Sequence, residues 1–258
     1  MLTFMQSSCR HLLITALFIY PIVLSPPHLS AQEVASSPQS FISINIGSQL
    51  LANTFTDNDS FELFAEEGRF SSNYQGQRDI SFDVGVGIPV WSNLSLGSAL
   101  TYINHNSLAT ISAELPHPFF FDKYRSIDGI AKDLERREIA VHIQALWTIP
   151  LSPTISLTVF GGPSFFNLRQ ELVNTVNFTE AYPFDTADFS GVLKVHPSDS
   201  TIGFHGGFDL AAYFTEHLGL GGTIRLSKGT ADLARTNESV ISVPVGGMHA
   251  SGGLRIRF

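Results

Sequence analysis

Eight segments of this chain alternate apolar and polar side chains with a period of two, and this alternation limits the fold more than any other feature. In the segment DISFDVGVGIPV, one face collects Ile80, Phe82, Val84, Val86, Ile88 and Val90. The opposite face carries Ser81, Asp83, Gly85, Gly87 and Pro89. Because successive side chains of a strand point to opposite sides, the alternation predicts a β-strand with one apolar and one polar face.

The connections between the segments alternate in length. The eight strands are expected at 41–50, 79–90, 94–102, 137–149, 155–166, 201–214, 218–227 and 248–258. Short turns around WSN, PLSPT and TEH form the second, fourth and sixth connections. The other connections span residues 51–78, 107–136, 173–200 and 229–239. In the last segment, ISVPVGG is out of phase, and Pro244 indicates a bulge or an edge there.

This pattern predicts an all-β protein, an eight-stranded antiparallel transmembrane up-and-down β-barrel over residues 41–258. Such barrels have an even number of strands, short periplasmic turns and long extracellular loops. A tilted strand needs roughly 9–11 residues to cross a bilayer, as these segments provide. The small and polar residues of the second face suit a barrel interior, which eight strands leave just wide enough for side chains to fill. A soluble sandwich or lipocalin-like binder is the alternative, although it needs large apolar side chains inside.

The first residues predict an export signal. Residues 1–31 carry Arg10 as their only charge, an apolar run of about thirteen residues, LLITALFIYPIVL, and a breaker-rich end. This is the layout of a cleaved signal peptide. Cleavage is expected after Ala31, with Ala35 as the alternative and an uncleaved membrane anchor as the other interpretation. Residues 32–40 then form a short N-terminal segment before the barrel.

The carboxy-terminal strand carries the most specific resemblance. In GGLRIRF, Leu254, Ile256 and Phe258 share one face and Arg255 and Arg257 the other. This ending resembles that of the small eight-stranded outer-membrane β-barrel proteins of Gram-negative bacteria (OmpA/OmpX-like). The resemblance implies that Leu254, Ile256 and Phe258 form a membrane-insertion signal for the outer-membrane insertion machinery. It also implies a location in the cell outer membrane, in contact with its lipid and lipopolysaccharide, and we expect a monomer.

Two groups of residues are candidates for function. Strand parity places a polar cluster in the interior, comprising Asp83, His142, His205, Asp209, Arg225 and Arg255. Asp209 and Arg225 are expected to pair diagonally across a turn. The cluster is interpreted as a charge-paired plug, with a proton or ion path or a catalytic pair of His205 and Asp209 as alternatives. Arg225→Leu is accordingly expected to lower the unfolding midpoint.

The second group lies in the loop ELPHPFFFDKYRSIDG, where Phe119, Phe120, Phe121 and Tyr124 form a possible surface-contact loop. These aromatic side chains are expected either to contact a partner, to join the aromatic girdle at the lipopolysaccharide boundary, or to pack on other loops. The charged run KDLERRE (132–138) is expected to form a helical turn or to continue its strand beyond the membrane.

Charge and composition exclude several function classes. The net charge of −8, which becomes −9 without Arg10, argues against nucleic acid as a partner. The only cysteine is Cys9, so no disulfide or cysteine-based site is expected after cleavage. No catalytic, cofactor or metal motif is found. We therefore expect a non-enzymatic barrel with a structural or surface-interaction role in envelope integrity, adhesion or ligand contact. A narrow channel for small solutes is the alternative, followed by a lipid-directed enzyme and a soluble binder.

Overall fold

The computed structural model describes residues 39–51, 54–76, 80–235 and 239–258, which form β-strands joined by turns. The predicted signal peptide and residues 32–38 of the short N-terminal segment lie outside the described residues. Within the described part of the chain, no helix is both long and apolar enough to span a bilayer.

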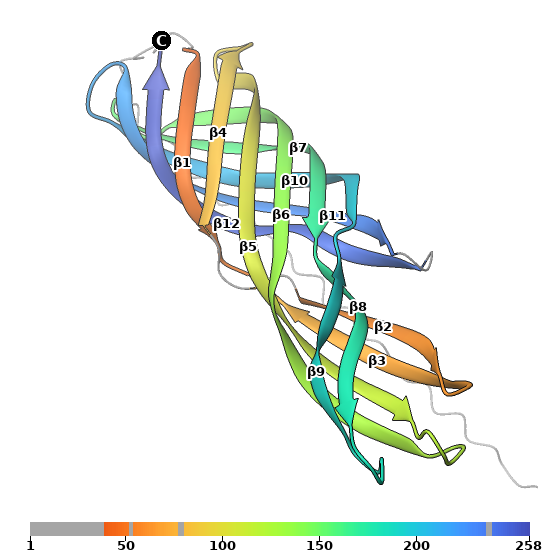
Figure 1. Ribbon diagram of the computed structural model, residues 1–258. Coiled ribbons are helices and arrows are strands. Elements are labelled where there is room, and N and C mark those ends of the chain that lie inside the picture. Colours follow the sequence, from red (N-terminus) through yellow and green to blue (C-terminus); the bar gives the residue numbers. More distant parts are fainter. Residues whose placement is uncertain (1–38, 52–53, 77–79, 236–238) are drawn as a thin grey trace, which may run out of the picture. The chain divides into compact units, whose positions relative to one another are not determined.

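Eight strands pair side by side into a closed antiparallel ring (Figure 1). In ring order they are β1 (Phe41–Gln49), β4 (Ile80–Pro89), β5 (Leu94–Pro116), β6 (Tyr124–Pro150), β7 (Ile155–Gln170), β10 (Ser198–Tyr213), β11 (Leu218–Ala234) and β12 (Val240–Arg257). β12 closes the ring on β1, with Phe41 opposite Arg257 and Gln49 opposite His249. The predicted eight-stranded antiparallel barrel is confirmed.

The three short turns lie where the sequence predicts them, between β4 and β5, β6 and β7, and β10 and β11. Each is closed by backbone hydrogen bonds across its ends. The amide of Val90 donates to the carbonyl of Leu94 at 2.9 Å, and that of Leu151 to Ile155 at 2.9 Å. These three tight turns form one rim of the ring.

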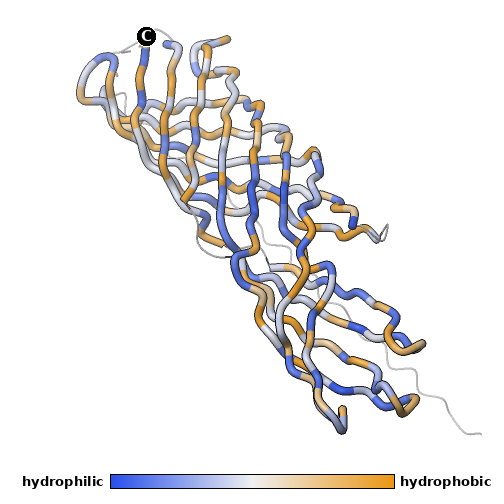
Figure 2. Tube along the Cα trace, in the orientation of Figure 1, coloured by the Kyte–Doolittle hydropathy of each residue, from blue (hydrophilic) through white to orange (hydrophobic). Residues whose placement is uncertain are grey.

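In the section of the ring next to the short turns, the apolar side chains point outward. On β4, Ile80, Phe82, Val84, Val86 and Ile88 are all exposed, whereas Ser81 and Asp83 between them are buried. Figure 2 shows apolar and polar residues alternating along the strands. Closing the sheet pairs every backbone group, so an apolar outer band can face hydrocarbon. Ten residues tilted by about 40° cover about 25 Å along the barrel axis, the height of a membrane-facing band. We call this section the barrel.

The long connections, predicted as loops, are mostly β-structure. The first forms the hairpin of β2 (Thr54–Leu63) and β3 (Glu66–Gln75), and β3 pairs with the distal part of β5. The second is a continuation of β5 and β6 themselves, paired as far as Pro116 and Tyr124. The third forms the hairpin of β8 (Leu172–Glu180) and β9 (Ala187–Val195), which pair only with each other. KDLERRE therefore continues its strand, as one of its two interpretations predicted.

These strands enclose an apolar core at the end of the ring opposite the short turns. We call this section the head: β2, β3, β8 and β9, with the distal parts of β5, β6, β7, β11 and β12. Its buried side chains include Phe70, Tyr74, Ile111, Leu115, Leu134, Leu168, Leu172, Leu233, Val243 and Val245. Its outer face is largely polar, with Ile130, Leu193 and Val240 as exposed apolar exceptions. The outward positions of β5 change from Leu100 and Tyr102 to Asn104, Asn106 and Thr110. The head is therefore apolar inside and polar outside, the reverse of the barrel.

This reversal explains the segment ISVPVGG. Val243 and Val245 point inward, like His249 and Arg255 further along β12, and the pairing of β11 with β12 has no register shift. The strand alternates without interruption, but the apolar residues move from its outward positions to its inward positions. They do so because the interior is polar in the barrel and apolar in the head. Of the two predictions at Pro244, the bulge is absent from this pairing, in which Thr230 lies opposite Pro244. The edge is confirmed, because the pairing of β12 with β1 ends at His249 and leaves Pro244 unpaired on that side.

Candidate functional site

A buried ion pair in the barrel interior joins β4 to β11, three strands away around the ring. Asp83 on β4 accepts hydrogen bonds from Arg225 on β11 at 2.5 Å, from Thr101 at 2.8 Å and from Asn45 at 3.0 Å. Arg225 also donates to the Thr101 hydroxyl at 2.8 Å. Because all four side chains are buried, the carboxylate and the guanidinium compensate each other's loss of water.

Two histidines extend this group around the wall. His142 on β6 is hydrogen-bonded through Nε2 to Thr101 at 3.2 Å and through Nδ1 to Ser164 at 2.8 Å. Ser164 in turn lies 2.9 Å from Nδ1 of His205. The chain from Asp83 to His205 is thus a sequence of carboxylate, hydroxyl, imidazole, hydroxyl and imidazole groups.

The expected pairing of Asp209 with Arg225 is wrong. Asp209 instead pairs with Arg255 on β12 and accepts a hydrogen bond from Thr223 at 2.6 Å. Arg255 also donates to the side-chain oxygen of Asn45 at 2.5 Å. Arg225 points across the lumen to Asp83. Asp209, which lies nearer to the short turns, therefore pairs with Arg255. His205 and Asp209 thus have different partners, which separates the two members of the suggested catalytic pair.

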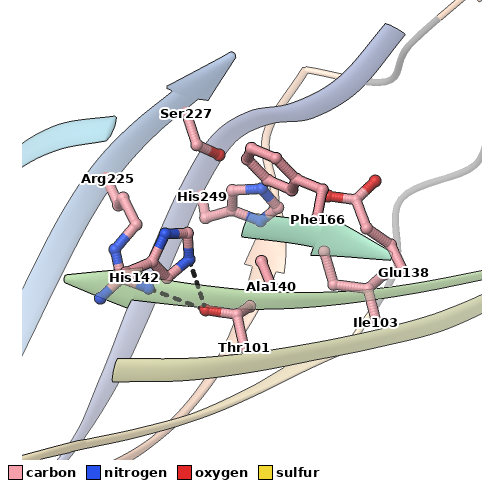
Figure 3. Close-up of a pocket in the computed structure, with 9 residues that line it drawn as sticks. All are labelled: Thr101, Ile103, Glu138, Ala140, His142, Phe166, Arg225, Ser227 and His249. Atoms are coloured by element: carbon pink, nitrogen blue, oxygen red, sulfur yellow. Dashed lines mark hydrogen bonds between the residues drawn. The ribbon is translucent and has the colours of Figure 1, made fainter. Parts of the chain in front are cut away.

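The interior is filled rather than hollow. A cavity of about 10 Å³ lies between Glu138, His142, Arg225 and His249 (Figure 3), room for about one water molecule. Ser164 is fully buried and His142 is 1% exposed, so no substrate reaches the Ser–His contacts. Among the described residues, no group of three or more His, Cys, Asp or Glu side chains is placed to hold a metal ion. The arrangement acts as a polar filling of the barrel.

A second charge pair lies at the border between the barrel and the head. Arg136 donates to Glu138 at 3.0 Å and to the carbonyl of Pro244 at 2.8 Å. Glu138 also accepts the amide of Gly246 at 2.9 Å. The φ of +82° at Gly246 favours glycine, and the hydrogen bond from its amide ties the backbone of β12 to this charge pair.

Of the three residues of the predicted insertion signal, Leu254 and Ile256 lie on β12, between β1 and β11, and Phe258 directly follows this strand. Leu254 and Phe258 point outward, 42% and 66% exposed, and Ile256 is half-buried on the same face. They extend the outer apolar band to the rim with the short turns. Trp91 and Trp147, also exposed, lie at or near the same rim, as the aromatic residues of a membrane interface do.

The predicted contact loop lies at the far tip of the head. Phe119, Phe120 and Phe121 occupy the turn between β5 and β6, and Tyr124 begins β6. All four are exposed. The 15 residues of β5 from Tyr102 to Pro116 cover about 45 Å along the strand, which places the phenylalanines beyond an aromatic girdle.

Two neighbouring hairpins bring further aromatic rings to this end (Figure 1). Phe64 lies in the turn between β2 and β3, and Tyr182 and Phe184 lie between β8 and β9. The ring of Phe184 stands edge-on to that of Phe119 at 5.5 Å and to that of Tyr182 at 6.1 Å. We call this group the aromatic tip: Phe64, Phe119, Phe120, Phe121, Tyr182 and Phe184.

Polar contacts tie the three hairpins together. Arg125, 4% exposed, donates to Glu180 at 2.5 Å, to the carbonyl of Phe184 at 3.1 Å and to that of Pro116 at 2.8 Å. Lys123 donates to Asp185 at 2.6 Å, and its ammonium holds the pKa of the Asp185 carboxyl below its usual value. The amide of Asp122 donates to Glu66 on β3 at 2.8 Å.

Sequence reasoning missed part of both groups. Asn45, Thr101 and Ser164 share the inward parity of their strands, a signal that was available in the alternation. Phe64, Tyr182 and Phe184 lie in segments that the sequence predicts as loops, and the sequence holds no signal for which turns lie next to one another. Only the pairing of β3 with β5, and the contacts of the β8–β9 hairpin, bring them to Phe119.

Comparison with known proteins identifies similar folds only among solved structures. No family model matches the chain, and no curated protein matches it. The outer membrane protein OprG from Pseudomonas aeruginosa aligns over 86% of this chain and 96% of its own, at 8% identity and a TM-score of 0.46. Neisserial surface protein A aligns over 85% and 97%, at 10% identity and a TM-score of 0.44. The outer membrane protease OmpT from Escherichia coli aligns over 86% and 98%, at 9% identity and a TM-score of 0.45.

Proposed function

We propose that this chain is an integral outer-membrane protein of a Gram-negative bacterium, whose barrel anchors a rigid head that makes contacts outside the cell. The observation that carries this proposal is the reversal of polarity along the strands. Lipid is the medium that favours an apolar outer face on the barrel, and water the medium that favours a polar outer face on the head. The short turns then face the periplasm and the head faces outward.

The filled interior supports a role in contact rather than passage. The lumen is crossed by the Asp83–Arg225 and Asp209–Arg255 pairs, and its cavity has room for about one water molecule. The head, by contrast, carries exposed aromatic side chains on hairpins held together by ion pairs. Binding surfaces are commonly carried on rigid scaffolds of this kind.

Single cysteines test the orientation. Ser112→Cys places a thiol on the outer face of the head, Ile143→Cys places one in the apolar band, and Thr215→Cys places one in a short turn. In intact cells a membrane-impermeant maleimide should label Ser112→Cys and leave the other two unlabelled. After permeabilisation it should also label Thr215→Cys. The unsubstituted chain controls for Cys9.

Two results would contradict the proposal. Recovery of the protein in the soluble fraction, without a difference in gel mobility between boiled and unboiled samples, would exclude a membrane barrel. Labelling of Thr215→Cys in intact cells, with Ser112→Cys protected, would reverse the orientation and place the head in the periplasm.

A further inference from the structure

The aromatic tip exposes more apolar surface than its hairpins need. Phe119, Phe120, Phe121 and Tyr182 are 67%, 58%, 77% and 85% exposed. A polar side chain at these turns would be hydrated at no cost, whereas each exposed ring orders water around its faces. Exposed apolar patches of this kind on a folded protein mark sites of interaction.

Backbone strain at the same turns indicates that the rings themselves are required. Phe64 and Phe184 adopt positive φ angles of 54° and 68°, as do Ala65, which follows Phe64, at 64° and Asp122, which follows Phe121, at 60°. A side chain in this left-handed region costs about 1–2 kcal/mol relative to glycine. Glycine or asparagine is the usual solution in such turns. Phenylalanine at positions 64 and 184 therefore lowers the stability of the turn but places an aromatic ring at the tip.

The tip is also held in one arrangement before any partner arrives. Arg125 joins β6 to Glu180 on β8 and to the backbone of Phe184, and the Lys123–Asp185 pair makes a second link. A pre-ordered surface loses little conformational entropy on binding, so its contacts convert into affinity more fully.

The net charge of the tip indicates which kind of partner it can bind. The tip segments 62–69, 119–125 and 180–188 contain seven carboxylates and three basic side chains. Two of the bases, Lys123 and Arg125, are already paired with Asp185 and Glu180. This acidic rim repels polyanions, such as lipopolysaccharide or a sulfated glycan, and it also repels a second copy of itself. It attracts a cationic surface.

We propose that the aromatic tip is a docking site for a cationic protein surface, in which apolar pockets receive Phe119, Phe121 and Tyr182 while basic residues meet the acidic rim. Large rings that fill pockets dominate the affinity of protein interfaces, and a surrounding charged rim sets partner choice and association rate. This inference rests on the proposed function, because the head must face the medium outside the cell.

Synthetic peptides test this chemistry on the full chain in phosphatidylcholine nanodiscs. The probes are a peptide of alternating Lys and Leu, one of Lys and Ser, one of Glu and Leu, and heparin, each corrected for binding to empty nanodiscs. The Lys–Leu peptide should bind most tightly, and its affinity should fall several-fold when salt is raised from about 50 to about 500 mM. The Glu–Leu peptide and heparin should not bind.

Substitutions locate the site. The triple variant Phe119→Ser, Phe121→Ser and Tyr182→Ser should weaken Lys–Leu binding at least tenfold. Leu193→Ser removes a similarly exposed apolar side chain from the stem of the β8–β9 hairpin and should leave binding unchanged. Phe64→Gly should fold with equal or greater stability, because it relieves a positive φ, and yet bind more weakly.

The outcomes separate the two proposals. Equal binding by the triple variant and wild type, or binding of heparin as tight as that of the Lys–Leu peptide, would overturn the docking site. If Ser112→Cys is labelled from outside while no peptide binds, only the docking inference fails. If Ser112→Cys is protected in intact cells, the proposed function fails whatever the peptides do.

Discussion

At the scale of single residues, the barrel interior is held together by charges that compensate each other across the lumen. Asp83 on β4 and Arg225 on β11 come from strands three apart in the ring, so neither is neutralised by a neighbour on its own hairpin. Parity predicted which residues point inward, but the pairing depends on the reach of each arginine. Arg225 crosses the lumen and Arg255 takes Asp209.

Arg225→Leu is expected to lower the free energy of unfolding by about 3–5 kcal/mol, because it leaves the Asp83 carboxylate buried without its guanidinium. Adding Asp83→Asn to this variant should restore more than half of the loss. Urea titration of the protein in detergent micelles measures both. Arg69→Leu is the control, since the Arg69–Glu67 contact is 69% and 59% exposed and should contribute less than about 1 kcal/mol. An equal loss in both variants would contradict the buried pair.

In the head, Tyr74 is a titrating residue outside the membrane. Burial raises the pKa of its hydroxyl to about 12, although that hydroxyl accepts the amide of Val173 at 2.8 Å. Below pH 10 both the folded and the unfolded states keep the proton. Between pH 10 and about 12 the unfolded state loses it first, so the stability of the head should fall as pH rises.

Absorbance titration of tyrosinate checks this expectation. Wild type should show a late ionisation step near pH 12, and the amplitude of this step should be smaller in Tyr74→Phe. Tyr182→Phe, which removes an exposed hydroxyl, should keep the late step. A complete titration of wild type by pH 11 without unfolding would show that Tyr74 is accessible to water.

At the scale of elements, the head depends on how added hairpins attach to long ring strands. β3 joins by backbone pairing with β5, whereas β8 and β9 pair only with each other and attach through side chains. Phe189 on β9 packs against Gly129 on β6, where a Cβ atom would overlap its ring. Lys194 secures the other end of β9 by donating to the carbonyl of Asp133 at 2.7 Å.

Gly129→Ala is therefore expected to displace the β8–β9 hairpin and to destabilise the head by about 1–3 kcal/mol. Limited trypsin digestion reports the displacement as faster cleavage after Lys194. Gly222→Ala is the matched control, because a Cβ there would approach only the carbonyl of Ser251 at 3.9 Å. Equal cleavage rates in the two variants would mean that Phe189 does not hold the hairpin in place.

At the scale of the whole described molecule, one ring of strands forms two sections of opposite polarity. The barrel has a polar filling and an apolar surface, and the head has an apolar core and a polar surface. Because the ring strands β5 and β6 run continuously through both sections, the head is an extension of the membrane-facing wall rather than a separately attached domain.

The filled lumen predicts that the protein does not conduct ions. Incorporated into planar bilayers, wild type should show no stable conductance steps, because the side chains of eight strands occupy the interior. The same preparation must show heat-dependent gel mobility, which establishes that folded protein was incorporated. Reproducible steps from folded wild type would instead favour the narrow channel.

The closed ring can be predicted from the amino-acid sequence alone. Period-two alternation on Ile80 to Val90, and on the strands that follow, depends only on strand geometry and on the medium at each face. The alternation of short and long connections set strand order and direction. The inward parity of Asp83, His142, His205, Asp209, Arg225 and Arg255 followed in the same way. All of these are local properties that can be counted along the chain.

The head and the ion pairs inside the barrel depend on contacts between segments far apart in the sequence. The segments 54–75 and 172–195 became hairpins because β5 and β6 extend beyond the membrane and offer them an edge and a face to pack on. The aromatic tip needs turns about sixty residues apart, such as Phe119 and Phe184, to meet. Contacts of this kind depend on distances in three dimensions and on the closure of long loops, and neither leaves a periodic signal in the sequence.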